Sequence, residues 1–176
     1  MTAETLPFSG QYQGADFSPC RTWRYSLTRA WSLSRTGRVA FIGLNPSTAD
    51  ETADDPTIRR CCKFARTWGY SGIYMLNIFA FRATDPRDMM QAADPIGPDN
   101  DEYILRIANR SNLIVCAWGV HGAYLNRGAA VSKMLIQAQC RLRCLTLTAH
   151  GHPGHPLYLK GDTRPKEFAG YGKEAR

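Results

Sequence analysis

Four short apolar runs divide the chain, and each leads into polar or turn-forming residues. The runs lie at residues 39–42, 73–79, 112–118 and 143–148. Their length and their bulky residues are typical of strands that are buried on both faces of a sheet. Apolar residues at helical spacing occupy the intervals, most clearly between residues 56 and 68. Strands that alternate with helices predict a parallel sheet that is covered on both faces.

The pattern predicts an α/β fold, namely a three-layer α/β/α domain on a central four-stranded parallel sheet. Apolar and aromatic residues at mostly alternate positions between residues 23 and 31 predict a strand or hairpin at the sheet edge. Residues 1–20 are rich in small and turn-forming residues without a period, so we expect a flexible or surface-wrapping segment. The remainder, 21–176, is expected to form a single domain.

The helical segments have recognisable ends. The helix at 56–68 carries a cationic polar face and is expected to end at Gly69. A further helix is expected at 99–109. The segment 119–140 is expected to be helical apart from a break at Gly128.

The charge of the chain favours a polyanionic partner. Lys and Arg number 22 against 15 Asp and Glu, which gives a formal charge of +7. The acidic residues gather at 50–55 and 94–102, and this leaves 21–38, 59–66 and 141–166 locally basic. Such segments suit nucleic acid, although a solvated basic surface gives the same pattern.

The sequence contains no apolar run of membrane-spanning length, and its first residues lack the basic flank and apolar core of a signal peptide. We therefore expect a cytoplasmic monomer without a membrane partner. The six cysteines include no C-x-x-C pair, so neither a disulfide framework nor a zinc ribbon is indicated. Zinc bound by His150, His152 and His155 with Cys144 is an alternative, but we expect no metal and no cofactor.

Polar residues follow all four predicted strands, and the carboxyl ends of parallel strands meet at one edge of a sheet. The residues concerned are Asn45, Asn77, Trp118-Gly119 and the histidines that follow the last strand. Asn45 is also a normal residue for a turn. Asn77 either pairs with backbone or faces a ligand, because an unpaired buried amide costs about 1 to 3 kcal/mol.

These pieces, in this order, resemble the uracil-DNA glycosylase superfamily. That superfamily has a strand ending in G-[IQLM]-[ND]-P, a strand ending in L-N, a strand running into W-G before a helix, and a last strand followed by H-P and Leu. The matching segments here are Gly43-Leu44-Asn45-Pro46, Leu76-Asn77, Trp118-Gly119-Val120-His121-Gly122 and His155-Pro156-Leu157.

A longer part of the chain is similar to the uncharacterised family called domain of unknown function 1643. This similarity runs through residues 24–29, 55–61 and 82–86 to residues 155–159. That family brings no established activity. The superfamily resemblance, in contrast, implies a uracil-DNA glycosylase-like fold and hydrolysis of the N-glycosidic bond of an abnormal or modified base in DNA, as in DNA repair.

The resemblance also implies roles for individual residues. Asn45 would orient the attacking water, and His155 would donate a hydrogen bond to the leaving base. Asn77 would read the edge of a flipped base, and Phe79 or Phe81 would stack on it. The other substrate contacts would come from Gly43, Leu44, Pro46, Ser47, His152 and Leu157. The nucleic acid would be held by Arg59, Arg60, Lys63, Lys160 and Arg164.

The sequence departs from the superfamily pattern at two places, and it also lacks the four cysteine ligands of the iron–sulfur branch. No aromatic residue follows the first motif, where residues 47–55 are acidic instead. Both His152-Pro153 and His155-Pro156 fit the last motif. Acidic side chains beside the pocket would repel a phosphate backbone unless they point away or bind a metal. Two alternatives therefore stay open: a non-catalytic module that binds nucleic acid or nucleotide, and a small-molecule enzyme that acts on a nucleoside-like substrate.

Overall fold

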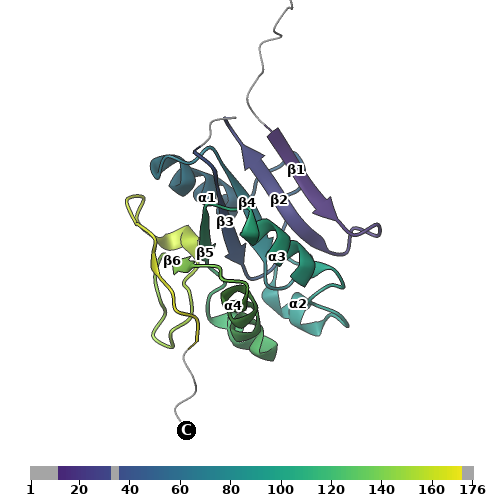
Figure 1. Ribbon diagram of the computed structural model, residues 1–176. Coiled ribbons are helices and arrows are strands. Elements are labelled where there is room, and N and C mark those ends of the chain that lie inside the picture. The colour runs from purple at the N-terminus through teal and green to yellow at the C-terminus, as the bar shows by residue number, and fades with distance from the viewer. Residues whose placement is uncertain (1–11, 33–35, 172–176) are drawn as a thin grey trace, which may run out of the picture.

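A computed structural model describes residues 12–32 and 36–171 and shows a single mixed sheet with helices on both faces (Figure 1). The sheet has seven strands in the order β1-β2-β4-β3-β5-β6-β7. The strands are β1 (Tyr12–Phe17), β2 (Arg24–Ala30), β3 (Arg38–Gly43), β4 (Gly72–Asn77), β5 (Leu113–Cys116), β6 (Leu142–Cys144) and β7 (Lys166–Glu167). Strands β4, β3, β5 and β6 run parallel, whereas the β1–β2 hairpin and β7 pair antiparallel at the two edges.

The α/β class expected from the sequence is correct, and β2 lies where a strand or hairpin was expected at the sheet edge, but the sheet also contains β1 and β7 and is therefore larger than predicted. Strand β1 falls inside the segment expected to be flexible or surface-wrapping, of which residues 1–11 lie outside the described part. Three of its six residues are exposed and the other three are only partly buried, so the strand carries no apolar alternation that would reveal it. It is held instead by its ladder with β2, where Tyr12 pairs with Ala30 and Ala15 pairs with Leu27.

Alternation along β3 explains why its apolar run is continuous. Val39 and Phe41 face one helical layer, and Ala40 and Ile42 face the other. Both faces are packed, so all four side chains are fully buried. Such a strand cannot show the period of two that marks a sheet with one wet face.

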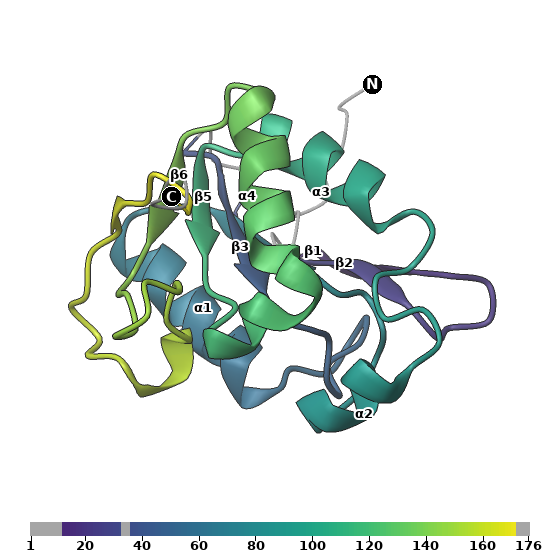
Figure 2. The same cartoon turned by 90° about the horizontal axis from the view of Figure 1, so that it is seen from below.

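Helix α1 (Pro56–Thr67) covers one face, while α2 (Pro86–Gln91), α3 (Asn100–Asn109) and α4 (Arg127–Gln137) pack on the other (Figures 1 and 2). The start of α1 is fixed by its sequence, because the Asp55 side chain accepts a hydrogen bond from the Ile58 amide and Pro56 opens the first turn. Gly69, at φ +85°, follows its end as expected.

The break expected at Gly128 lies a few residues earlier. Leu125 and Asn126 take positive φ values of 51° and 52° between the 3-10 helix η1 (Val120–Asn126) and α4, and Gly128 lies inside α4. Gly128 is required for close packing, since a Cβ atom there would lie 2.8 Å from Trp118 Nε1 and 3.0 Å from the Gly122 carbonyl oxygen. The glycine therefore marks a close approach and not a helix end.

The connections create a crevice at one edge of the sheet. The chain passes from β3 through α1 to β4 on one side, and then returns across β3 to β5 on the other side. Ligands in open α/β sheets bind at the carboxyl ends of strands where the strand order reverses in this way. Across residues 12–32 and 36–171, no helix is both long and apolar enough to span a membrane.

Candidate functional site

A pocket of about 650 Å³ lies at the reversal point, and its volume is typical of sites for small ligands. The ends of β3, β4 and β5 form its floor through Gly43, Asn77 and Ala117. The loop after β6 contributes His155 to one side. Segments far apart in the sequence therefore meet here, as expected for the carboxyl edge of a parallel sheet.

Six of the predicted site residues line this pocket, namely Gly43, Leu44, Asn45, Ser47, Asn77 and His155. The other five do not line it. Pro46 is buried beneath the turn, where its carbonyl oxygen accepts hydrogen bonds from the Ala83 amide and from Asn45 Nδ2. Leu157 also lies outside the pocket lining, but its backbone amide donates a hydrogen bond to His155 Nδ1.

The two phenylalanines expected to stack on a base are placed elsewhere. Phe79 is fully buried in the core, with its ring 5.7 Å from that of Tyr124. Phe81 pairs with Trp23 in an isolated bridge and lines a separate, shallow groove. Aromatic rings do border the pocket, but they belong to Trp118 and to Tyr158, which is 88% exposed.

Asn45 is held in one orientation by the backbone. Its side-chain nitrogen donates to the Ala83 carbonyl oxygen at 2.7 Å and to that of Pro46 at 3.2 Å. Both acceptors are carbonyls, so the nitrogen must face them and the side-chain oxygen must face the other way. Since Asn45 lines the pocket, its Oδ1 is the atom available to accept a hydrogen bond from a ligand or water.

Asn77 is fixed from behind by a residue that we did not predict. Arg24 Nη2 lies 3.4 Å from Asn77 Oδ1, and because a guanidinium only donates, the amide oxygen must face it. The Nδ2 group then faces Gly43, where an added Cβ atom would lie only 3.0 Å away. Asn77 therefore presents its amide nitrogen to the pocket, and its oxygen is shared with Arg24.

His155 has a defined tautomer. The Leu157 backbone amide donates to His155 Nδ1 at 3.3 Å, so Nδ1 carries the lone pair and the proton of the neutral ring is on Nε2. Partial burial lowers the pKa of His155 below its ordinary value of 6.5, although the negative charge of Asp55 acts in the opposite direction. At neutral pH the ring is thus uncharged and offers an Nε2–H donor.

The structure separates the two histidines that fit the last motif. His152 lies outside the pocket, where its Nδ1 is 2.8 Å from the hydroxyl oxygen of Tyr171. The same hydroxyl accepts a hydrogen bond of 2.8 Å from Trp118 Nε1. His152 therefore belongs to a hydrogen-bond network with Tyr171 and Trp118 and does not line the pocket in which a substrate contact was predicted for it.

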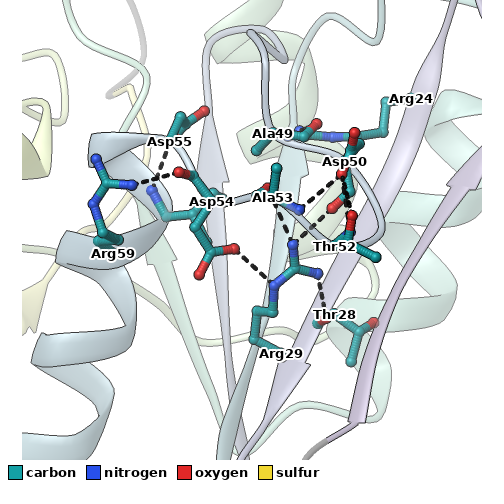
Figure 3. A network of polar contacts seen from close by, with 11 residues as sticks. Arg24, Thr28, Arg29, Ala49, Asp50, Thr52, Ala53, Asp54, Asp55 and Arg59 are labelled. Atoms are coloured by element: carbon teal, nitrogen blue, oxygen red, sulfur yellow. Dashed lines mark hydrogen bonds and ion pairs between the residues drawn. The ribbon is translucent and has the colours of Figure 1, made fainter.

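Two of the four carboxylates in the acidic loop pair with arginines, and Figure 3 shows the pair of Asp54 with Arg29. Asp54 pairs with Arg29 at 2.8 Å, and Glu51 pairs with Arg21 at 2.7 Å. Asp50 Oδ1 accepts hydrogen bonds from the amides of Thr52 and Ala53. Asp55 caps α1 and is the one member of this loop's acidic group that lines the pocket. The ion pairs of Asp54 and Glu51 therefore reduce the expected repulsion of a phosphate backbone, whereas Asp50 and Asp55 form no ion pair among the described residues.

The predicted nucleic-acid-binding cations surround α1. Arg59 and Lys63 are exposed on the helix, and Lys160 and Arg164 are exposed on the loop that follows η2 (Pro156–Tyr158). Trp68 Nε1 holds that loop against α1 through the Thr163 carbonyl oxygen at 3.1 Å. Arg60 differs from the others, because it donates to the Leu159 carbonyl oxygen and packs over Phe64.

The shallow groove that Phe81 lines adjoins the pocket and is basic, and the sequence did not predict it. The groove shares Ser47, Ala83 and Thr84 with the pocket, and Arg21 and Arg82 also line it. The hydroxyl-bearing residues Thr22 and Thr48 complete its polar lining. Hydroxyls next to guanidinium groups are the usual contacts of nucleic-acid phosphates.

Metal binding finds no support in the described residues, where no group of three His, Cys, Asp or Glu side chains is close enough to hold an ion. His150, His152 and His155 thus do not form the alternative zinc site. Two charged residues of the pocket, Arg24 and Asp55, were not among the predicted site residues. Each belongs to a segment that was matched by sequence, but an arginine in an alternating strand and an Asp-Pro helix start both have ordinary structural explanations.

Comparison with known proteins identifies a family for the chain. A family model described as "Protein of unknown function (DUF1643)" matches residues 24–157. No curated protein and no solved structure matches the chain. The matched range begins at Arg24 and contains every residue named above as lining the pocket except Tyr158. Because the match covers more than half of the sequence, the chain belongs to the family of unknown function DUF1643.

Proposed function

We propose that this protein is a glycosylase-like hydrolase that cleaves the N-glycosidic bond of an abnormal or modified base, with DNA as the substrate. The proposal rests on one observation: the acceptor Oδ1 of Asn45, the amide nitrogen of Asn77 and the Nε2–H donor of His155 share one pocket. These are the three functions that this reaction requires. The resemblance of the strand-end motifs to the uracil-DNA glycosylase superfamily agrees with them.

The reaction separates a sugar with cationic character from a base with anionic character. Asn45 Oδ1 would accept a hydrogen bond from water and orient the water oxygen toward the sugar carbon, as the resemblance implies. The water forms the new bond to that carbon as the bond between carbon and base nitrogen breaks. The electron pair of the broken bond stays on the base, and the proton that the water loses passes through solvent to the base anion, which leaves a sugar hydroxyl and a neutral base.

His155 and Asn77 would stabilise the departing base. A neutral imidazole can donate from Nε2 to an oxygen of the base as negative charge develops there, and it needs no pKa above neutrality to do so. The Asn77 amide nitrogen donates to the same edge of the base. Tyr158, which is exposed at the rim, would supply the aromatic contact for an unstacked base that the sequence did not locate.

The groove beside the pocket supports a polymeric substrate. Arg21, Arg82 and the surrounding hydroxyl-bearing residues would contact phosphates while the target base occupies the pocket. The exposed cations of α1 and the loop after η2 would extend this contact. The ion pairs of Glu51 and Asp54 reduce the negative charge that would oppose such binding, and the pair with Glu51 leaves Arg82 as the groove arginine without a carboxylate partner in the described residues.

The experiment is base release from single- and double-stranded oligonucleotides that carry uracil, hypoxanthine, or oxidised or hypermodified bases. We expect free base from the parent protein, and a loss of at least about 100-fold in rate for Asn45→Ala and for His155→Ala. Asn109→Ala is the matched control, because Asn109 is exposed at the end of α3 and outside the pocket.

Three outcomes would exclude the proposal. Release of base by Asn45→Ala at the parent rate removes the catalytic assignment. If no oligonucleotide of the panel releases base but the oligonucleotides bind tightly and in a salt-dependent way, the protein is a non-catalytic nucleic-acid-binding module. If no base is released but nucleosides stabilise the folded protein, it is a small-molecule enzyme.

A further inference from the structure

Arg24 is a buried arginine at the pocket whose charge has no carboxylate partner. It is 2% exposed and lines the pocket at the start of β2. Its Nη1 donates to the Ala49 carbonyl oxygen at 2.8 Å, and its contact with Asn77 Oδ1 is long, at 3.4 Å (Figure 3 shows the contact with Ala49). Within residues 12–32 and 36–171, its Nε has no partner and no ion pair includes it.

The other buried arginines of the described chain show what is missing. Arg29 pairs with Asp54, and Arg127 pairs with Asp101. In both cases a carboxylate balances the charge that the fold removes from water. A buried charge without a partner destabilises a protein, because burial removes its hydration and nothing replaces it. Arg24 is thus in an unfavourable state that a bound anion would relieve.

The surroundings of Arg24 leave it positively charged. Burial lowers the pKa of Arg24 to about 10, and Arg82 and Arg29 act in the same direction, while Asp55 and Asp50 oppose them. That value still keeps the guanidinium protonated at neutral pH. A guanidinium presents five N–H donors in a planar fork that matches the oxygens of a phosphate or carboxylate. Its unused Nε–H and the remaining Nη hydrogens supply donors for such a group.

We propose that the pocket contains an oxyanion subsite at Arg24, which binds a phosphate or carboxylate group of the substrate. The inference rests on the proposed function for the identity of that substrate, and it specifies an anionic one. The oxyanion is either a phosphate on the sugar or a carboxylate on the base. Neutral nucleosides and neutral bases leave the charge of Arg24 unbalanced, so they bind less tightly.

The test compares matched ligands on the full-length parent protein by isothermal titration. The pairs are uridine with uridine 5′-monophosphate and uracil with 5-carboxyuracil, and inorganic phosphate is added alone. We expect the anionic member of one pair to bind at least about tenfold more tightly than its neutral counterpart. A preference in the first pair assigns the subsite to a sugar phosphate, and a preference in the second assigns it to the base.

Three variants test whether Arg24 produces the preference. Arg24→Gln removes the charge and should abolish the preference, while Arg24→Lys should retain part of it because the charge remains. Arg106→Gln, which changes an exposed arginine on α3, is the control and should behave like the parent. Circular dichroism establishes that each variant is folded. If Arg24→Gln fails to fold, the ligand pairs on the parent and on Arg24→Lys still decide the matter.

Equal binding of neutral and anionic ligands to the parent overturns the inference. Absence of binding by every anion in the panel at millimolar concentration overturns it as well. If Arg24→Gln keeps the full preference for anionic ligands, the anion binds elsewhere, and the inference is overturned as well. These are equilibrium measurements without base release, so a failure of the glycosylase proposal leaves their outcome readable. If the protein releases base but shows no preference for anions, the subsite proposal fails and the glycosylase proposal stands.

Discussion

The two ends of strand β2 bury chemically identical groups in opposite ways. Arg29, near the end of the strand, pairs with Asp54 at 2.8 Å and donates to the carbonyl oxygens of Thr28 and Asp50. Arg24, at the start, has one short hydrogen bond and no ion pair among the described residues. Both side chains are almost fully buried, at 4% and 2% exposure. Burial alone therefore does not distinguish them.

The difference lies in what each end of the strand faces. Arg29 closes the acidic loop onto the sheet, and its hydrogen bonds are satisfied within the fold (Figure 3). Arg24 faces a pocket at the carboxyl edge of the parallel strands. A satisfied buried charge indicates a structural role, whereas an unsatisfied one beside a cavity indicates a ligand. The adjacent Asp54 and Asp55 show the same contrast, because Asp54 pairs with Arg29 within the fold and only Asp55 lines the pocket.

The largest effect on stability is expected at the Arg29 end. Arg29→Met leaves Asp54 and several carbonyl oxygens without their donor, and we expect the free energy of unfolding to fall by about 3 kcal/mol. Urea denaturation measures this change. Arg24→Met is the matched control, and it should change stability by less than about 1 kcal/mol because it also removes an unpaired buried charge. Equal losses in the two variants would show that the ends of β2 do not differ.

A smaller loss is expected when only the partner of Arg29 changes. Asp54→Asn keeps the shape of the side chain but removes its charge, and we expect a loss of about 1 to 2 kcal/mol. The value is moderate because the Asp54 side chain is 30% exposed and water screens the pair. Glu102→Gln serves as the control, since that exposed pair with Arg106 spans 3.7 Å and should contribute little. A loss no larger than that of the control contradicts the structural role of Arg29.

This contrast also explains which parts of the molecule the sequence could predict. The parallel strands, α1 and the strand-end residues Asn45, Asn77 and His155 follow from local pattern and from the rule that strand ends converge. The alternating pattern around Arg24 indicates packing first, with a phosphate contact of Arg24 as the alternative, and it does not show that the side chain is buried at a pocket. Its burial depends on β4 and on the loop at Ala49, which lie 53 and 25 residues away in the sequence. Local pattern contains no information on such contacts.

Other errors have the same origin. Phe79 ends the second apolar run and Phe81 follows it, so both were expected at the site, but Phe79 packs into the core and Phe81 lines the neighbouring groove. His152 and His155 fit one motif equally well. They differ because His152 contacts the hydroxyl of Tyr171 outside the pocket, whereas His155 lines the pocket and accepts a hydrogen bond from the Leu157 amide. Strand β1 stays hidden because its exposed residues carry no apolar period.

On the pocket side, Asp55 is expected to influence charge more than stability. Asp55→Asn keeps a good helix cap, so the free energy of unfolding should change by only a few tenths of a kcal/mol, about the difference between these two caps. The same change removes the negative charge that raises the pKa of His155, and that pKa should fall further below 6.5. An NMR titration of the His155 ring measures the shift. Asp54→Asn, on the Arg29 side, should leave the pKa of His155 nearly unchanged, and equal shifts in both variants would remove the distinction between the neighbours.

The smallest effect expected is a dependence of stability on pH at His155. The folded protein holds its pKa below 6.5, whereas the unfolded chain has the ordinary value, so the unfolded state binds more protons between the two values. Stability is therefore full above pH 6.5, falls as the pH decreases through this window, and levels off below the folded pKa. Protonation also places a hydrogen on Nδ1, which removes the acceptor of the Leu157 amide and loosens the start of η2. Urea midpoints measured from pH 7.5 to pH 4.5 should show this step in the parent and in His150→Gln, which changes an exposed histidine, but not in His155→Gln. A step that persists in His155→Gln would belong to another group, and the neutral Nε2–H donor proposed for the leaving base would then have no support from titration.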